Sequence, residues 1–344
     1  MDTMHVNPSR TEKLLEVQGL NIDIHVGKGP DARVKKVVRD VDFSVEAGKT
    51  LCIVGESGCG KSLTALSILS LLPPVAERRV SKLRFAGEDM ATLNHAGLTK
   101  LRGGRIAMIF QDPMTSLNPV FTVGTQLTDV LRRHKRVSKR EAWDRATYLL
   151  ERVGITNAQD RLKQYPFELS GGLRQRVMIA MALMCGPELL IADEPTTALD
   201  VTVQAELLDL LKDIQREFKL GMVFISHDLG LVSRIADDVI VMYTGDIVES
   251  GPAQTVLRNP QHPYTELLLR CVPRPGSTPA KSALPSIAGA VPSLDVAIQG
   301  CAFYDRCPAR EDACRKDLAL TGTGLHRYRC VKPGALRRDI EVAA

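Results

Sequence analysis

A glycine-rich loop between a short apolar run and a helix-forming stretch constrains the fold more than any other feature of the chain. Residues 55–62 read Gly-Glu-Ser-Gly-Cys-Gly-Lys-Ser and follow the apolar run 51–54. Glycines allow a sharp turn, so that consecutive N–H groups can point toward phosphate oxygens. The pattern predicts a buried strand, a phosphate-binding loop and a helix over about 62–72, which Pro73 and Pro74 end.

Two side chains of this loop, Lys61 and Ser62, carry its expected chemistry. The Lys61 ammonium should reach the β- and γ-phosphates of a nucleoside triphosphate, and the Ser62 hydroxyl should ligate Mg²⁺. Cys59 needs no special role, because the backbone does the binding and any small residue fits; the alternative is that alkylation of its thiol blocks ATP. The expected nucleotide contacts are Gly55, Glu56, Ser57, Gly58, Cys59, Gly60, Lys61, Ser62 and Leu63.

A second apolar run, residues 189–192, ends in two adjacent carboxylates. Asp193 is expected to hold Mg²⁺ through water. Glu194 then points elsewhere, because side-chain direction alternates along a strand. It is the candidate for the group that orients and deprotonates the attacking water, an assistance worth about 10²–10⁴ in rate. The pair predicts hydrolysis of the bound triphosphate.

Polar side chains follow two further apolar runs. Gln111 comes after residues 106–110, and its amide is expected to touch both Mg²⁺ and the attacking water. His227 comes after residues 223–226, where a donor could hold the γ-phosphate and position Glu194. The carboxyl ends of strands are where ligands bind in sheets of this type, so both residues are predicted to be catalytic.

The order of these patterns predicts a largely parallel sheet covered by helices. Short apolar runs at 51–54, 106–110, 188–192 and 222–225 are typical of buried strands. A helix is expected over 201–218, between the last two of them. Strands that alternate with helices indicate an α/β fold.

Four other segments have a different character. Alternating apolar residues over 14–24 and 41–45 predict two strands, and 238–249 is expected to form a hairpin or strand pair. From about 122 to 165 apolar residues recur at helical spacing among many charges, which indicates a separate helical subdomain. Residues 272–293 are rich in Pro, Ser, Ala and Gly and are expected to be a linker or extended segment.

Composition narrows the class of protein. The chain has 344 residues, of which 44% are hydrophobic and 25% charged, and a net charge of +5 without a basic stripe argues against nucleic-acid binding. The basic run 132–136 is most simply a solvated helix face, with a membrane-surface or partner contact as the alternative. No apolar stretch approaches the length of a bilayer span, and residues 1–13 hold no apolar signal region, so a cytoplasmic location is expected.

A third glycine-containing segment precedes the acidic pair. Ser170, Gly171 and Gly172 open a helix expected over 173–184. The exposed N–H groups at such a helix start form an anion site. The alternative is an ordinary N-cap by Ser170, and the two roles can coexist.

Taken together, these motifs resemble those of the ABC-transporter ATPases, in order and spacing, over roughly residues 14–260. Gly55 to Ser62 resembles the Walker A loop of that family, and residues 190–194 resemble its Walker B strand with the catalytic glutamate. Gln111 resembles the Q-loop, Ala198-Leu199-Asp200 the D-loop, His227 the H-loop and Leu169-Ser170-Gly171-Gly172-Leu173 the signature.

The resemblance implies a fold and an assembly. It implies an ABC ATPase domain over 1–260, with a RecA-like core sheet, an antiparallel β-subdomain and a helical subdomain at about 112–168. It also implies that two ATPases face each other. Ser170, Gly171, Gly172 and Asp200 would then contact ATP bound to the opposite subunit, so that each nucleotide lies between two chains.

Two positions depart from the family pattern. No aromatic residue is present around Gly29 to Val38, where the family usually stacks one on adenine, and Val34 or another apolar side chain is expected to replace it. Leu173 stands where the signature commonly has glutamine, which peptide-importer members tolerate.

Three segments carry a narrower resemblance, to the ATPases of dipeptide/oligopeptide (Dpp/Opp) importers: residues 111–119, 193–204 and 259–265. This implies an ATPase that powers peptide uptake from the cytoplasmic face of the inner membrane. Its implied partners are a second, paralogous ATPase, two membrane permeases and, indirectly, a periplasmic peptide-binding protein. The alternatives are import of nickel or another small solute, a soluble ABC ATPase acting on nucleic acid, and a regulatory module without turnover.

Cysteines gather in the last part of the chain, within the expected C-terminal region 261–344. Cys301, Cys307, Cys314 and Cys330 are four of the eight cysteines, and four thiolates suit Zn²⁺ or an iron–sulfur cluster. Their spacing fits neither a zinc ribbon nor a bacterial ferredoxin. The Dpp/Opp resemblance implies a [4Fe–4S] cluster, with zinc or free thiols as alternatives. The expectation for Cys52, Cys185 and Cys271 is that of buried small apolar residues.

Overall fold

The computed structural model describes residues 13–27, 33–197, 199–272, 285–293 and 298–336. Its centre is a sheet of eight strands in the order β12-β13-β11-β10-β3-β9-β8-β7. The pairs from β10 to β7 are parallel, and those among β10, β11, β13 and β12 are antiparallel. The strands are β3 (Thr50–Val54), β7 (Ile106–Ile109), β8 (Leu189–Asp193), β9 (Gly221–Ser226), β10 (Asp238–Tyr243), β11 (Asp246–Pro252), β12 (Thr321–Thr323) and β13 (His326–Tyr328).

The central strands form where the sequence has unbroken apolar runs. Every residue of β3, β8 and β9 is buried, as expected of strands covered on both faces. The strand pair predicted for 238–249 is confirmed as β10 and β11. Helices α1 (Lys61–Ile68), α8 (Val201–Phe218) and α9 (Leu229–Ile235) follow β3, β8 and β9 and connect the strands, which confirms the α/β fold.

A second, antiparallel sheet packs beside the first. Its path is β2-β1-β5-β6, and β4 also pairs with β1. The strands are β1 (Lys13–Val26), β2 (Arg33–Glu46), β4 (Ala76–Arg79), β5 (Lys82–Phe85) and β6 (Glu88–Asp89). Both predicted strands are present but longer than expected, since residues 33–38 of β2 pair with residues 22–26 of β1.

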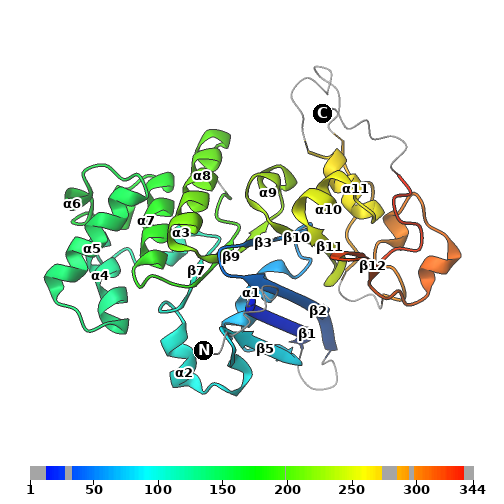
Figure 1. Ribbon diagram of the computed structural model, residues 1–344, viewed down its shortest axis with the longest axis horizontal. Coiled ribbons are helices and arrows are strands. Elements are labelled where there is room, and N and C mark those ends of the chain that lie inside the picture. The colour runs from blue at the N-terminus through cyan, green and yellow to red at the C-terminus, as the bar shows by residue number, and fades with distance from the viewer. Residues whose placement is uncertain (1–12, 28–32, 198, 273–284, 294–297, 337–344) are drawn as a thin grey trace, which may run out of the picture.

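A group of helices forms one end of the molecule (Figure 1). α4 (Val123–His134), α5 (Lys139–Arg152) and α7 (Gly171–Leu183) contact one another, and α6 (Ala158–Arg161) packs on α5. Thr122 caps α4, and Ser138 forms a capping box with Glu141 at α5, which explains why both helices begin at polar residues. The smaller helices α2 (His95–Leu101) and α3 (Pro113–Ser116) flank β7.

The C-terminal part lies at the opposite end in Figure 1 and joins the central sheet through β13, which pairs with β11. Glu249 of β11 is fully buried and accepts hydrogen bonds from the N–H groups of Gln261 (2.7 Å) and His262 (2.9 Å) and pairs with His326 of β13 (2.7 Å). This carboxylate therefore ties three chain segments together. Helices α10 (Ala253–Arg258) and α11 (Pro263–Arg270) lie between them in sequence.

The predicted end of the first helix is wrong. The helix expected over 62–72 ends at Ile68, before Pro73 and Pro74. Ser70 takes a left-handed conformation (φ 52°), and the Leu71 N–H reaches back to the Leu66 carbonyl at 2.9 Å. This reversed turn satisfies the last carbonyls of the helix, so the helix closes through its own C-cap rather than through the prolines.

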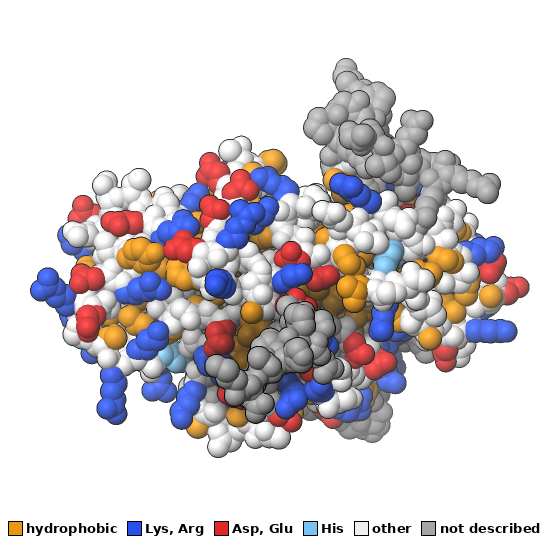
Figure 2. Space-filling view, in the orientation of Figure 1, with side chains coloured by type: hydrophobic (Ala, Val, Ile, Leu, Met, Phe, Trp, Pro, Cys, Tyr) orange, Lys and Arg blue, Asp and Glu red, His pale blue; other side chains and the backbone are white. Residues whose placement is uncertain are grey.

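No helix in the described ranges combines the length and apolar character that crossing a bilayer would need. On the face shown in Figure 2, Lys and Arg side chains are interspersed with Asp and Glu and do not form one stripe.

Candidate nucleotide site

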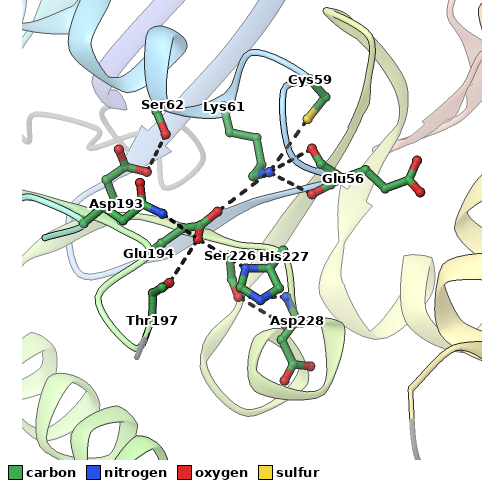
Figure 3. Close-up of polar contacts among 12 residues, drawn as sticks. Glu56, Cys59, Lys61, Ser62, Asp193, Glu194, Thr197, Ser226, His227 and Asp228 are labelled. Carbon is green, nitrogen blue, oxygen red and sulfur yellow. Dashed lines mark hydrogen bonds and ion pairs between the residues drawn. The ribbon is translucent and has the colours of Figure 1, made fainter. Parts of the chain in front are cut away.

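The carboxyl ends of four neighbouring parallel strands bring the predicted residues to one edge of the central sheet. Val54 pairs with Ser226, Asp193 with Ile225 and Ile109 with Ala192, so the residues that follow these strand ends are neighbours. These residues are Gly55, Gln111, Glu194 and His227. The close-up in Figure 3 shows the side chain of Glu194 between those of Lys61 and His227, with Asp193 next to Ser62.

The phosphate loop turns sharply at Gly55. Its φ is +151°, and a Cβ placed there would lie 2.2 Å from the Met242 carbonyl oxygen, so only glycine fits. The Lys61 ammonium is buried beneath the loop and donates to the carbonyls of Gly55 (2.8 Å) and Glu56 (3.1 Å). Gly60 precedes α1 with φ +98°, and no side chain caps this helix start. The first N–H groups of α1 are thus available to an anion.

Ser62 and Asp193 form a pair of oxygen donors. The Ser62 hydroxyl donates to Oδ1 of Asp193 at 2.9 Å. Burial raises the pKa of the Asp193 carboxyl, and the hydrogen bond from Ser62 opposes that rise in part. A hydroxyl and a carboxylate at this separation are the hard oxygen ligands that Mg²⁺ prefers, so the donor set fits the expected metal.

The Glu194 carboxylate is held by three neutral or weakly basic partners. Its Oε2 lies 3.2 Å from Gln111 Nε2, 3.0 Å from the Thr197 hydroxyl and 3.2 Å from His227 Nδ1. Its Oε1 lies 3.9 Å from the Lys61 ammonium. Glu194 itself has a left-handed backbone, with φ 45°, which turns its side chain out of the strand direction.

Thr197 is a site residue that sequence reasoning missed. It is one turn beyond Glu194, and its N–H also donates to the Glu194 carbonyl at 3.1 Å. The sequence clue to Thr197 was its position three residues after Glu194. That spacing brings the two side chains together only if the chain turns directly after β8. Because Thr197 holds the side most distant from Lys61, it restricts Glu194 to one orientation.

Cys59 lies within the loop but is shielded. It is 1% exposed, and its Sγ is 3.9 Å from the Lys61 ammonium. Burial raises the pKa of this thiol, and the nearby lysine lowers it by less. The thiol is therefore neutral at ordinary pH and packs as a small apolar group.

The residues of the predicted signature form a separate cluster. Ser170 caps α7 by accepting from the Leu173 N–H, and Asp200 caps α8 by accepting from the Val203 N–H at 3.0 Å. A Cβ on Gly172 would lie 3.7 Å from Val203, so the two helix starts are neighbours. Within the described residues, no polar contact joins this cluster to the phosphate loop. Ala198 of the predicted D-loop lies outside the described residues.

The candidate adenine contact, Val34, is on β2 and 55% exposed. It pairs across the strands with His25. Residues 28–32 of the surrounding segment lie outside the described ranges. Val34 therefore has space for a ligand, and its role stays a prediction.

The four C-terminal cysteines line one small cavity together with His262. All eight cysteines of the chain are free thiols. Burial raises the pKa of Cys301 to about 11 and that of Cys330 to about 12, and the neighbouring thiols add to both rises. The donor chemistry suits a thiolate metal site. The cavity of about 10 Å³, however, is the size of one water molecule, and no group of three or more His, Cys, Asp or Glu side chains among the described residues is arranged to hold a metal ion.

Comparison with known proteins agrees with this geometry. A family model described as "ABC transporter" matches residues 38–197, and one described as "Oligopeptide/dipeptide transporter, C-terminal region" matches residues 248–314. A solved dimeric ATP-binding cassette, MJ0796, in a post-hydrolysis state bound to ADP and Pi, is similar with a TM-score of 0.60. Its sequence is 25% identical, and the match covers 70% of this chain and 98% of that one. Fold and site together define an ATPase of the ABC class.

Curated relatives narrow the class. The dipeptide transport ATP-binding protein DppD of Bacillus subtilis is 47% identical over 304 residues, which cover 88% of this chain and 89% of the relative. The oligopeptide transport ATP-binding protein AppD of the same organism is 46% identical over 302 residues, covering 88% and 90%. The chain belongs to the ATP-binding subunits of the dipeptide/oligopeptide ABC importers.

Proposed function

We propose that this chain hydrolyses ATP to power the uptake of di- and oligopeptides through a membrane importer. One observation carries the ATPase part: the Glu194 carboxylate is fixed by Gln111, Thr197 and His227 directly beside Lys61. A non-hydrolysing module would not need a carboxylate oriented in this way at the edge where phosphates bind. The peptide part rests on the relatives, whose names specify dipeptide and oligopeptide transport.

The roles divide among the residues at the sheet edge. Lys61 and the loop N–H groups of residues 57–60 bind the β- and γ-phosphates, and Ser62, Asp193 and Gln111 would hold Mg²⁺. The metal, when bound, neutralises charge on the phosphate oxygens. Glu194 accepts the proton of the attacking water, while His227 donates to the γ-phosphate and keeps Glu194 in place.

The signature cluster supports a second ATPase as partner. Ser170 and Gly171 are exposed at the start of α7, and nothing lies within 4 Å of a Cβ placed on Gly171. A phosphate of ATP held by a facing subunit would approach these N–H groups unobstructed. Asp200, exposed at the neighbouring helix start, would contact the same interface.

An apolar groove supports a membrane-subunit partner. It has a volume of about 500 Å³ and lies between β7, α3, α4 and α7, lined by Ala107, Phe110, Val130, Met178 and Met181 among others. Phe110, which immediately precedes Gln111, is 42% exposed there. We infer that a short cytoplasmic helix of a permease docks in this groove, and that the chain is thereby held at the inner face of the membrane. Movement at Gln111 would then reach the permease directly.

The donor chemistry of four neighbouring thiols is the support for a metal centre in the C-terminal region. Cys301, Cys307, Cys314 and Cys330 would hold a [4Fe–4S] cluster, or Zn²⁺ as the alternative. A brown protein with absorbance near 400 nm, lost in a Cys307→Ser variant, supports the cluster. A colourless anaerobic preparation with one zinc per chain supports the alternative and excludes the cluster.

The experiment that tests the function uses the assembled importer. The chain is co-expressed with its permeases and its companion ATPase, and the complex is placed in liposomes with ATP on the nucleotide-binding side. Labelled dipeptide accumulation and phosphate release are measured for the native complex, for Glu194→Gln and for Glu206→Gln, an exposed carboxylate on α8. Glu194→Gln should retain ATP binding and lose both activities by about 10²–10⁴, and Glu206→Gln should lose neither. Phosphate release at the native rate by Glu194→Gln, or uptake of nickel in place of peptide, would contradict the proposal.

A further inference from the structure

Glu56, in the phosphate loop, is held by two residues from the C-terminal part of the chain. Its carboxylate forms a two-point ion pair with Arg306, with Nη1–Oε2 and Nη2–Oε1 distances of 2.6 and 3.0 Å. Its backbone N–H donates to the Tyr264 hydroxyl at 2.9 Å. Its carbonyl accepts from Lys61. Both the main chain and the side chain of this loop residue are therefore positioned from outside the nucleotide-binding core.

The Arg306 guanidinium has no freedom to leave this arrangement. Its side chain is only 5% exposed. Its N–H groups also donate to the Tyr243 hydroxyl (3.3 Å) and to the carbonyls of Ala288 (3.0 Å) and Ile287 (3.3 Å). It lies 5.8 Å from the centroids of the Tyr243 and Phe303 rings. A planar, fully bonded guanidinium fixes the direction of a carboxylate, which a flexible ammonium does not.

The backbone that carries Arg306 also carries two of the cavity cysteines. Arg306 is in a short 3₁₀ turn, Tyr304–Arg306, whose N–H groups bond back to Cys301 and Phe303. Cys307 follows directly and donates its N–H to the Tyr304 carbonyl at 3.2 Å. Phe303 is buried against Tyr243 and Tyr264, with ring centroids 5.2 Å apart in both pairs. A shift of Cys301 or Cys307 therefore moves the residue that holds Glu56.

We propose that Arg306 is a positioning residue of the nucleotide site, which sets the phosphate loop through Glu56 and couples the cysteine-lined cavity to ATP affinity. The proposal rests on the ATP binding proposed above. When the ion pair is lost, Glu56 and the carbonyl that holds Lys61 can shift, and the N–H groups of the loop no longer converge on the phosphates. The effect falls on nucleotide binding, because Arg306 touches neither Glu194 nor Ser62.

The first test separates positioning from simple packing. ATP Kd, KM, kcat and Tm are measured on the full complex for Arg306→Gln, Arg306→Lys, Glu56→Gln and the double variant. Arg310→Ala is the control, since Arg310 stacks on Tyr304 and donates to the Asp305 carbonyl away from the loop.

Arg306→Gln should raise Kd and KM about tenfold, within the range typical of coupled sites, and change kcat by less than about twofold. Arg306→Lys should recover part of the affinity. Adding Glu56→Gln to Arg306→Gln should have little further effect, because one interaction is removed once.

The second test needs no substitution and covers the case in which Arg306→Gln does not fold. Coupling between two sites is reciprocal, so bound nucleotide must change the cavity. Iodoacetamide labelling of Cys301 and Cys307 is followed by mass spectrometry in the native complex freed of any metal bound to these thiols, with and without Mg²⁺ and a non-hydrolysable ATP analogue. Cys185, buried next to α7, is the internal reference. Labelling of Cys301 and Cys307 should slow severalfold relative to Cys185.

The outcomes are distinct. A folded Arg306→Gln with native Kd and KM, or labelling rates that nucleotide leaves unchanged, overturns the coupling while ATP binding by the native complex stands. A native complex that binds no ATP refutes the function proposed above instead. A drop in Tm alone, with Kd unchanged, would reduce Arg306 to a packing role.

Discussion

Two helices of this protein, α1 and α7, both have glycines at their starts, before α1 and in the first turn of α7, yet their surroundings differ. The start of α1 is enclosed by strand ends, with Lys61 buried and Asp193 within hydrogen-bonding distance of Ser62. The start of α7 faces solvent, and its polar partner is its own cap, Ser170. The first has a lysine, a metal-ligand pair and a carboxylate assembled in one chain. The second has only N–H groups. On the function proposed above, its ligand would be the ATP of a facing subunit, and the contrast would explain how one chain can hold a nucleotide and still need a partner to hydrolyse it efficiently.

The largest effect is expected from blocking α7 without touching α1. Ser170→Arg places a long side chain over the exposed helix start. Phosphate release by the assembled importer should fall about 10²–10³-fold, the usual cost of losing donors to a developing charge. ATP Kd of the isolated chain should not change. If Kd of the isolated chain rose in parallel, the two helix starts would act within one molecule and the comparison would fail.

Removing the lysine charge at the start of α1 should instead weaken ATP binding by the isolated chain. Lys61→Ala should raise the ATP Kd of the isolated chain about 100-fold, because a buried charge-assisted contact to phosphate is lost. A fluorescent ATP analogue reports the change by titration. Lys100→Ala, an exposed lysine on α2, is the matched control and should bind as the native chain does. Equal losses in both variants would indicate a general charge effect.

A smaller effect is expected at His227, whose side chain is 57% exposed and contacts Glu194 from one side only. His227→Ala should lower kcat about tenfold, less than the 10²–10⁴ expected for a group that transfers the proton itself, because Gln111 and Thr197 still hold the carboxylate. Stopped-flow phosphate release gives kcat, and equilibrium titration should show an unchanged Kd. A variant with a raised ATP Kd and an unchanged kcat would contradict this assignment.

The smallest effect concerns the alkylation rate of the Cys59 thiol, which is buried beside the start of α1. Burial raises the pKa of this thiol above its ordinary value of 9.0. The thiolate is the reacting form, so the alkylation rate should keep rising above pH 9, where an ordinary thiol levels off. Rates are measured by mass spectrometry from pH 7 to 10. A plateau below pH 9 would show an exposed thiolate.

How far the sequence predicts the molecule depends on whether the cause is local. The helix over 201–218 was predicted at both ends, because it lies between the apolar runs 188–192 and 222–225, which the sequence shows directly. The strand-end cluster was predicted because apolar runs followed by a polar residue mark both the strand and its edge. The end of α1 was not, since it depends on a left-handed Ser70 that no residue type announces. Arg306 was missed because it is 250 residues from Glu56, and only the folded C-terminal part brings them together.

The attachment of β13 to β11 has a practical consequence for anyone who wants a smaller cassette. A polypeptide stopped near residue 260 would keep the Glu249 side chain but lose the Gln261, His262 and His326 groups that hydrogen-bond to it. It would also leave the edge of β11 without its partner strand β13, and an unpaired strand edge can pair with other copies of the chain. We expect such shortened forms to precipitate during purification, so inclusion bodies from them would report a damaged sheet and say nothing about catalysis.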